Sequence, residues 1–107
     1  MCSDIPIGTA KSTILIENTR TRVTRWTFPM RGDNTGWHKH EYDYVVLPLY
    51  DGHLDIETAN GERVTVAMES GVPYFRELGV EHEVISANDH EYAFIEMEFL
   101  ESPKKNA

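Results

Sequence analysis

Two histidines separated by a single residue offer the clearest metal chemistry in this sequence. His38 and His40 flank Lys39 in a run that is expected to form a β-strand. Successive side chains of a strand point to opposite faces, so both imidazoles would project to one side and Lys39 to the other. Two such imidazoles can share one ion. Taken alone, however, a His-x-His pair is more often solvated or hydrogen-bonded than bound to a metal.

The residues around this pair belong to a longer pattern of glycines and histidines. Residues 32–52 contain a glycine, five residues, His-x-His and a second, more distant glycine, and residues 71–82 contain two glycines before a histidine. With these blocks the chain resembles the cupin superfamily over about residues 20–100. The stretches 36–40 and 42–48 are similar to small single-domain bacterial cupins named for β-alanine degradation. The resemblance implies an all-β jelly-roll barrel, the double-stranded β-helix.

The resemblance also implies a set of metal ligands. His82 stands in register with the histidine of the second motif, which makes it the third ligand beside His38 and His40. Such a set leaves coordination positions open for water, substrate or oxygen. Val45 stands in the place of the family's usual glutamate, so three neutral imidazoles remain. A divalent ion would then keep its full charge, which favours an anionic substrate.

Three other side chains, Tyr44, Tyr74 and Arg76, are the candidates for catalysis or substrate binding. The phenol of Tyr44 could donate a hydrogen bond to a metal-bound ligand, or Tyr44 could be a rim residue that packs on its ring. Arg76 shares a strand face with Tyr74. If that face is inward, Arg76 could clamp a carboxylate or an enolate, and if it is outward, Arg76 is a surface charge. Arg25 carries the same ambiguity.

Short β-rich runs between turn residues predict an all-β protein. The expected strands are 13–17, 20–28, 37–40, 44–50, 53–58, 63–67, 72–76, 82–86 and 92–100. Asp51-Gly52 and Asn60-Gly61 predict two hairpins. In the last strand, alternation predicts that Ala93, Ile95, Met97 and Phe99 face the core while Glu96 and Glu98 face solvent.

Length and charge limit the class of protein. A chain of 107 residues suits one domain, 1–107, with a barrel core at about 13–100. Its net charge of −8 argues against a general nucleic-acid or membrane surface and favours a small-molecule ligand. Cys2 allows no intrachain disulfide, and no apolar run predicts a signal peptide or membrane span, so we expect a cytoplasmic protein.

The ends, to about Ser12 and from Ser102, should fray unless a partner subunit holds them. Small cupins commonly dimerise, so the resemblance implies a homodimer.

Three functions follow as hypotheses. The first is an iron(II) dioxygenase for a small anionic molecule, with His38, His40 and His82 as ligands and Tyr44 or Arg76 as the orienting group. Imidazole ligands also suit zinc, nickel and copper, and manganese is a further candidate. The second is a metal-dependent isomerase, lyase or dehydratase that uses Tyr44, Tyr74 or Asp43 as acid or base. The third is a barrel that binds a small molecule without transforming it.

Overall fold

The computed structural model of the chain describes residues 8–101, which contain nine β-strands and no helix. The strands are β1 Lys11–Glu17, β2 Thr21–Phe28, β3 His38–Lys39, β4 Asp43–Pro48, β5 Gly52–Thr58, β6 Arg63–Met68, β7 Tyr74–Arg76, β8 Glu81–Ser86 and β9 Tyr92–Phe99. The all-β prediction is confirmed, and every expected strand is present. Nothing in the described part of the chain forms a helix that could span a membrane. Residues 1–7, with Cys2, and the whole predicted C-terminal end from Ser102 lie outside the described residues. Lys11 and Ser12, the last residues of the predicted N-terminal end, belong to β1.

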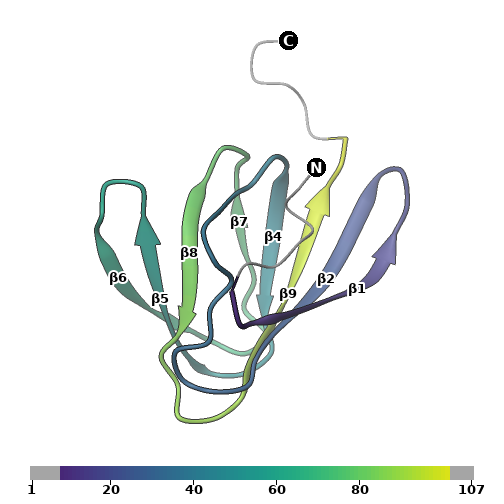
Figure 1. Ribbon diagram of the computed structural model, residues 1–107. Coiled ribbons are helices and arrows are strands. Elements are labelled where there is room, and N and C mark those ends of the chain that lie inside the picture. Colours follow the sequence, from purple (N-terminus) through teal and green to yellow (C-terminus); the bar gives the residue numbers. More distant parts are fainter. Residues whose placement is uncertain (1–7, 102–107) are drawn as a thin grey trace.

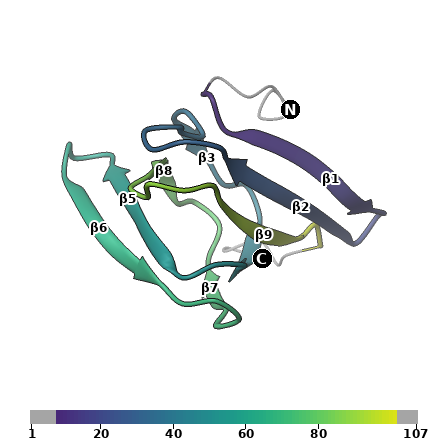
Figure 2. The same ribbon diagram turned by 90° about the horizontal axis from the view of Figure 1, so that it is seen from below.

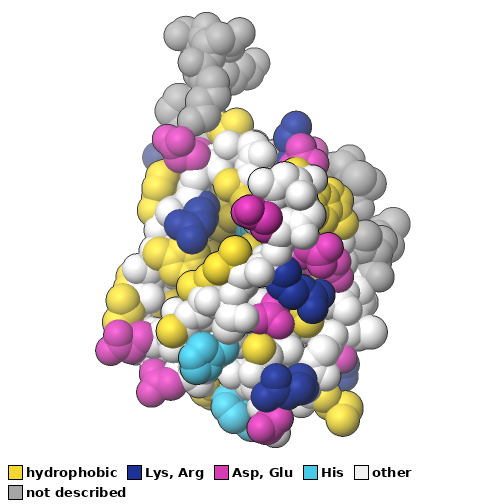
Figure 3. Space-filling view, turned by 90° about the vertical axis from the view of Figure 1, so that its left-hand side faces the viewer, with side chains coloured by type: hydrophobic (Ala, Val, Ile, Leu, Met, Phe, Trp, Pro, Cys, Tyr) yellow, Lys and Arg dark blue, Asp and Glu magenta, His cyan; other side chains and the backbone are white. Residues whose placement is uncertain are grey.

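The strands form two antiparallel sheets that face each other (Figure 1, Figure 2). One sheet has the order β1-β2-β9-β4-β7 and the other β3-β8-β5-β6. Strands that are distant in sequence therefore become neighbours, as when β9 inserts between β2 and β4. Seen from the side of the β6 edge, acidic and basic side chains are interspersed on the surface (Figure 3). The excess of acidic residues does not gather into one charged patch on that side.

One of the two predicted hairpins is wrong. A hairpin does join β5 to β6 around Asn60-Gly61, but its loop is longer than the two residues that the sequence predicts. Thr58 donates to the Glu62 carbonyl at 2.8 Å and accepts from the N–H of Gly61 at 3.0 Å, and only Gly61 of this loop has a positive φ, 88°. The Asp51-Gly52 segment instead carries the chain from β4 in one sheet to β5 in the other. Gly52 is needed there for a different reason, because a Cβ atom would lie 2.5 Å from the side-chain oxygen of Asn88.

The predicted faces of the last strand are also wrong. Alternation is present in β9, but Tyr92, Phe94, Glu96 and Glu98 are buried, whereas Ile95 and Met97 are half-buried and Phe99 is 40% exposed. Of the four residues predicted to face the core, only Ala93 is fully buried. The inward carboxylates are accommodated because other buried groups neutralise them or donate hydrogen bonds to them. Glu98, for example, accepts from the guanidinium of Arg22 at 2.7 Å.

Apolar side chains form a row on the outer face of the five-stranded sheet. Strand pairing aligns Ile16 with Val23, Val23 with Met97, Met97 with Val45, and Val45 with Phe75. The neighbours Tyr44 and Val46 are buried inside, so the row containing Val45 lies on the other face of the sheet. The outer face of this sheet therefore carries an apolar row, which a simple in-and-out pattern does not predict.

The close approach at Gly52 leads to a stability prediction. The Asn88 side chain accepts from the backbone N–H of His53 and donates to its carbonyl, both at 2.8 Å, and a Cβ at Gly52 would displace it. We expect Gly52→Ala to lower the free energy of unfolding by about 1–3 kcal/mol, measured by urea denaturation. The cost should shrink in an Asn88→Ala background, where the closest clash is gone and the approach to the Tyr92 ring, at 3.0 Å, remains. Strictly additive costs would contradict this account.

Candidate metal centre

Three imidazoles meet at one end of the barrel. His38 in β3 is the direct pairing partner of His82 in β8, and His40 follows β3 by one residue. The Nε2 atom of His40 lies 3.0 Å from Nε2 of His38 and 3.2 Å from Nε2 of His82. All three donors lie within 4.8 Å of one another. Ligands bound to one ion at about 2.0–2.1 Å would have separations of this size.

The hydrogen bonds of His38 indicate whether its ring is oriented to bind a metal. Its Nδ1 lies 3.0 Å from the carbonyl of Gly36, and because a carbonyl only accepts, Nδ1 carries the hydrogen. Nε2 of His38 is then free to offer its lone pair to the centre. A backbone carbonyl that fixes the ring in this way is typical of metal-bound histidine. Thr35 strengthens the arrangement by donating to the same carbonyl at 2.8 Å and accepting from the N–H of Val84.

Burial keeps these histidines in their neutral form. It lowers the pKa of His40 to about 2 and that of His82 to about 3, with His38 contributing to both shifts. Burial also lowers the pKa of His38. Neutral imidazole is the form that binds metals. The three residues thus provide a donor set that suits a divalent transition metal at neutral pH.

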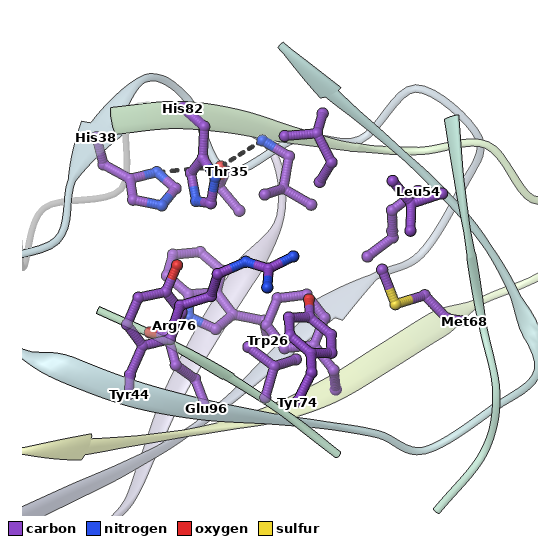
Figure 4. Close-up of a pocket in the computed structure, with 15 residues that line it drawn as sticks. Trp26, Thr35, His38, Tyr44, Leu54, Met68, Tyr74, Arg76, His82 and Glu96 are labelled. Atoms are coloured by element: carbon purple, nitrogen blue, oxygen red, sulfur yellow. Dashed lines mark hydrogen bonds between the residues drawn. The ribbon is translucent and has the colours of Figure 1, made fainter. Parts of the chain in front are cut away.

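Tyr44 lies directly against this group. Its ring stacks on that of His40 with centroids 3.9 Å apart and planes 17° apart. Its hydroxyl is buried and has no hydrogen-bond partner among residues 8–101. In Figure 4 this hydroxyl points toward the histidine wall of the pocket. Burial raises the pKa of Tyr44, so its phenol remains a proton donor at neutral pH.

The strand parity of β4 explains why Tyr44, and not Val45, faces the histidines. Val45 is only half-buried and belongs to the outer row, opposite Phe75 and Met97. The position assigned from sequence to the family's glutamate therefore points away from the centre. The inward position of β4 beside the imidazoles is filled by an aromatic ring.

Arg76 and Tyr74 in β7 both line the pocket. The guanidinium of Arg76 lies over the Tyr74 ring, 4.6 Å from its centroid, in a cation–π contact. Burial raises the pKa of Tyr74, which keeps its hydroxyl protonated. Arg25 lies elsewhere, since it shares its strand face with the outer Val23 and donates to Thr27. Asp43 accepts from the N–H of Leu78 and is not among the residues that line the pocket.

Glu96 was missed by the sequence-based prediction, which placed it in solvent. It is 8% exposed, its Oε2 atom lies 3.8 Å from Nε2 of His40, and it accepts a hydrogen bond from the Trp26 side chain. Burial and the nearby Glu98 raise the pKa of Glu96 to about 8. A usable signal was present in the sequence, because Tyr92 and Phe94 have the same parity and large aromatic side chains favour the core.

The pocket that joins these residues has room for about 60 Å³. This is enough for a few water molecules or a small organic molecule. Its wall changes character from one end to the other (Figure 4). His38 and His82 face Tyr44, Glu96 and Arg76 at the polar end, and Leu54 and Met68 lie at the apolar end.

Comparison with known proteins finds a relative by sequence. No protein-family model matches the chain. It is 46% identical over 89 residues to the β-alanine degradation protein BauB of Pseudomonas aeruginosa, which covers 83% of this chain and 92% of BauB.

Solved structures give the same result for the fold. A cupin domain from Bordetella pertussis has a TM-score of 0.80 and 48% identity, covering 84% of this chain and 92% of that domain. An RmlC-like cupin with a double-stranded β-helix fold from Methanocaldococcus jannaschii has a TM-score of 0.69 at 13% identity, covering 85% and 80% of the two chains. The predicted double-stranded β-helix is confirmed, and the chain belongs to the cupin superfamily.

Proposed function

We propose that this cupin is a metal-dependent enzyme that oxidises a small anionic molecule with dioxygen at iron(II). The observation that carries the proposal is the convergence of three neutral imidazoles, one held in a metal-binding tautomer, on the edge of a small pocket. His38, His40 and His82 would hold the ion. When bound, iron(II) supplies the one-electron and dioxygen chemistry that the side chains lack.

The chain's own residues would bind and orient the substrate. Arg76 presents a permanent positive charge to the pocket and would hold a carboxylate or an enolate. The cation–π contact with Tyr74 would keep the guanidinium in place. The hydroxyl of Tyr44 would donate to the substrate atom nearest the histidines, because it has no partner among the described residues. The apolar end around Leu54 and Met68 would exclude water.

A second candidate is an isomerase, lyase or dehydratase in which the metal acts only as a Lewis acid. The unpartnered hydroxyl of Tyr44 favours it, since a buried phenol that stays protonated can serve as a general acid. The position of Asp43 outside the pocket lining leaves Tyr44 and Tyr74 for the acid–base role. Oxygen uptake during turnover separates the two candidates.

A homodimer is the assembly we propose for the enzyme. The outer row on the five-stranded sheet, defined as Ile16, Val23, Met97, Val45 and Phe75, crosses all five strands without a charged residue. Phe75 is 52% exposed at the end of this row. An exposed apolar sheet face of this kind is typical of a protein interface. A second copy would present the same self-complementary surface through a two-fold axis.

The ligand assignment predicts how metal content responds to substitution. We expect His40→Ala to lose the stoichiometric metal that elemental analysis finds in wild-type protein purified without an affinity tag. His90→Ala serves as the control, because His90 is exposed and hydrogen-bonded to the Glu91 carbonyl. It should leave the metal content unchanged. Equal losses in both variants would mean that the three imidazoles do not hold the metal.

Because the buried hydroxyl of Tyr44 has no partner among residues 8–101, we expect its removal to lower activity without lowering stability. An unsatisfied buried polar group costs about 1–3 kcal/mol, so Tyr44→Phe should be at least as stable as wild-type protein, measured by urea denaturation without metal. Turnover should nevertheless fall while metal is retained. The matched control is Tyr92→Phe, whose hydroxyl is likewise buried and unpartnered among residues 8–101 but does not line the pocket. If both variants kept full turnover, Tyr44 would be a packing residue only.

The proposed dimer predicts a mass change on substitution in the outer row. Phe75→Lys should convert the dimer to a monomer in sedimentation velocity, because a charge would be buried at the interface. Val64→Lys is the control, since Val64 is also an exposed apolar residue, 49% accessible, but lies on β6 in the other sheet. A wild-type monomer, or dissociation by Val64→Lys alone, would argue against this interface.

A further inference from the structure

Arg76 is a cation at the pocket without an acidic partner. Other arginines, such as Arg22 and Arg31, form ion pairs with acidic side chains, whereas Arg76 forms none among residues 8–101. Its guanidinium has several N–H donors, and the protein acceptor that it reaches in this part of the chain is the Phe75 carbonyl, at 3.4 Å. Arg76 is exposed and lines the pocket, so an anion can approach it from solvent. In a chain with a net charge of −8, an arginine left without a carboxylate at a pocket indicates a place for an external anion.

The other end of the pocket is apolar (Figure 4). Leu54 in β5 and Val66 in β6 are cross-strand partners, and Met68 follows Val66 two residues later on the same strand face. All three line the pocket, and Leu54 and Met68 are buried. A water molecule is held firmly only where several polar groups surround it, which these side chains do not provide. An apolar part of a ligand would therefore displace weakly held water here, and this displacement favours binding.

The volume of the pocket limits the length of such a ligand. A water-sized position requires about 10–15 Å³, so the 60 Å³ of the pocket correspond to about four to six positions. A non-hydrogen atom of a carbon chain needs about the same room as one water molecule. The carboxyl carbon and its two oxygens take up part of this number. Only a short chain of carbon atoms remains for the apolar end.

We propose that the substrate is a short-chain monocarboxylate, bound at its carboxylate by Arg76 and along its apolar chain by Leu54 and Met68. This inference rests on the proposed function, because it names the substrate class of the same site. Met68 limits the length of the chain. A second carboxylate at the apolar end lacks a counter-ion, so dicarboxylates are rejected. The carbon atoms next to the carboxylate, and not the end of the chain, then lie on the side of the histidines.

The experiment follows the indole N–H signals of the two tryptophans in full-length, nitrogen-15-labelled protein by NMR. Trp26 lines the pocket, whereas Trp37 is 40% exposed and is not among the lining residues, so its signal is an internal control. Acetate, propionate, butyrate and hexanoate are titrated, and succinate and butyramide test the charge at each end of the ligand. The titrations use the zinc form and metal-free protein, because a carboxylate that binds only to the ion does not require Arg76.

In metal-free protein we expect the affinity measured at Trp26 to rise about 4-fold with each CH₂ group from acetate to butyrate, and to fall for hexanoate. Succinate and butyramide should each bind about 10-fold more weakly than butyrate. Arg76→Gln should weaken butyrate binding by about 10-fold, because the charge-assisted hydrogen bonds are lost. Arg25→Gln is the matched control, since Arg25 likewise forms no ion pair among residues 8–101 but lies on the outer face of its sheet. It should bind butyrate as wild-type protein does.

The length limit is tested at Met68. Met68→Ala should move the preference from butyrate to hexanoate, and Met68→Val, which removes less of the side chain, should do so in part. Met97→Ala is the control, because Met97 belongs to the outer row and does not line the pocket. Full butyrate affinity in Arg76→Gln, or an unchanged chain-length preference in both Met68 variants, would overturn this inference whatever the metal content. Butyrate binding as expected, in a protein whose His40→Ala variant keeps its metal, would contradict the proposed metal centre and support the carboxylate site.

Discussion

The structure depends on neutralising polar groups inside a barrel that has little room for water. Three imidazoles and two carboxylates lie within or beside one pocket of about 60 Å³. Each unsatisfied group there would cost more than a typical hydrogen bond gains. Most of these groups have a hydrogen-bond partner in the protein. Arg22 donates to Glu98, Trp26 donates to Glu96, and the Gly36 carbonyl accepts from His38. The hydroxyl of Tyr44 is an exception, and it lies where a ligand would bind. Apolar packing of Phe28, Tyr92 and Phe94 provides the rest of the interior.

The inward carboxylates have a consequence on the opposite side of the sheet. Because side chains of β9 alternate, turning Glu96 and Glu98 inward turns Ile95, Met97 and Phe99 outward. The neighbouring strands contribute Val23, Val45 and Phe75 to the same surface through their pairing. A polar interior on one face is thus linked to an apolar exterior on the other. The proposed metal centre and the proposed dimer interface would then both depend on which residues of β9 point inward.

Sequence alone predicted the strands well because turn residues and alternation are local signals. Asn-Gly between two alternating segments favours a hairpin turn, and the structure has a hairpin there. Alternation, however, shows which residues share a face and not which face is inward. Glu96 and Glu98 were assigned to solvent by their charge, and only the partners Trp26 and Arg22, about 70 residues away in sequence, make their burial acceptable. The same limit applies to Val45, which motif spacing assigned to the ligand position although β4 turns Tyr44 inward. The Asp51-Gly52 segment was misread because a glycine required by close packing against Asn88 resembles a glycine required by a tight turn.

The two walls of the pocket come from different sheets, so the spacing between the sheets sets the distance across the site. His38 and His82 belong to the four-stranded sheet, whereas Tyr44, Arg76 and Glu96 belong to the five-stranded sheet. The ring of His40 stacks on that of Tyr44 and so connects the two walls beside the Nε2 atoms of the three histidines. Backbone hydrogen bonds of His40 with Val80 and Gly79, both 2.8 Å, fix its position in turn. The spacing between the walls is otherwise set by the apolar residues deeper in the barrel, such as Leu54, Met68 and Phe94. Because tightly packed interiors transmit small changes in volume, these residues would influence the distance between the proposed metal ligands and the proposed substrate-binding groups.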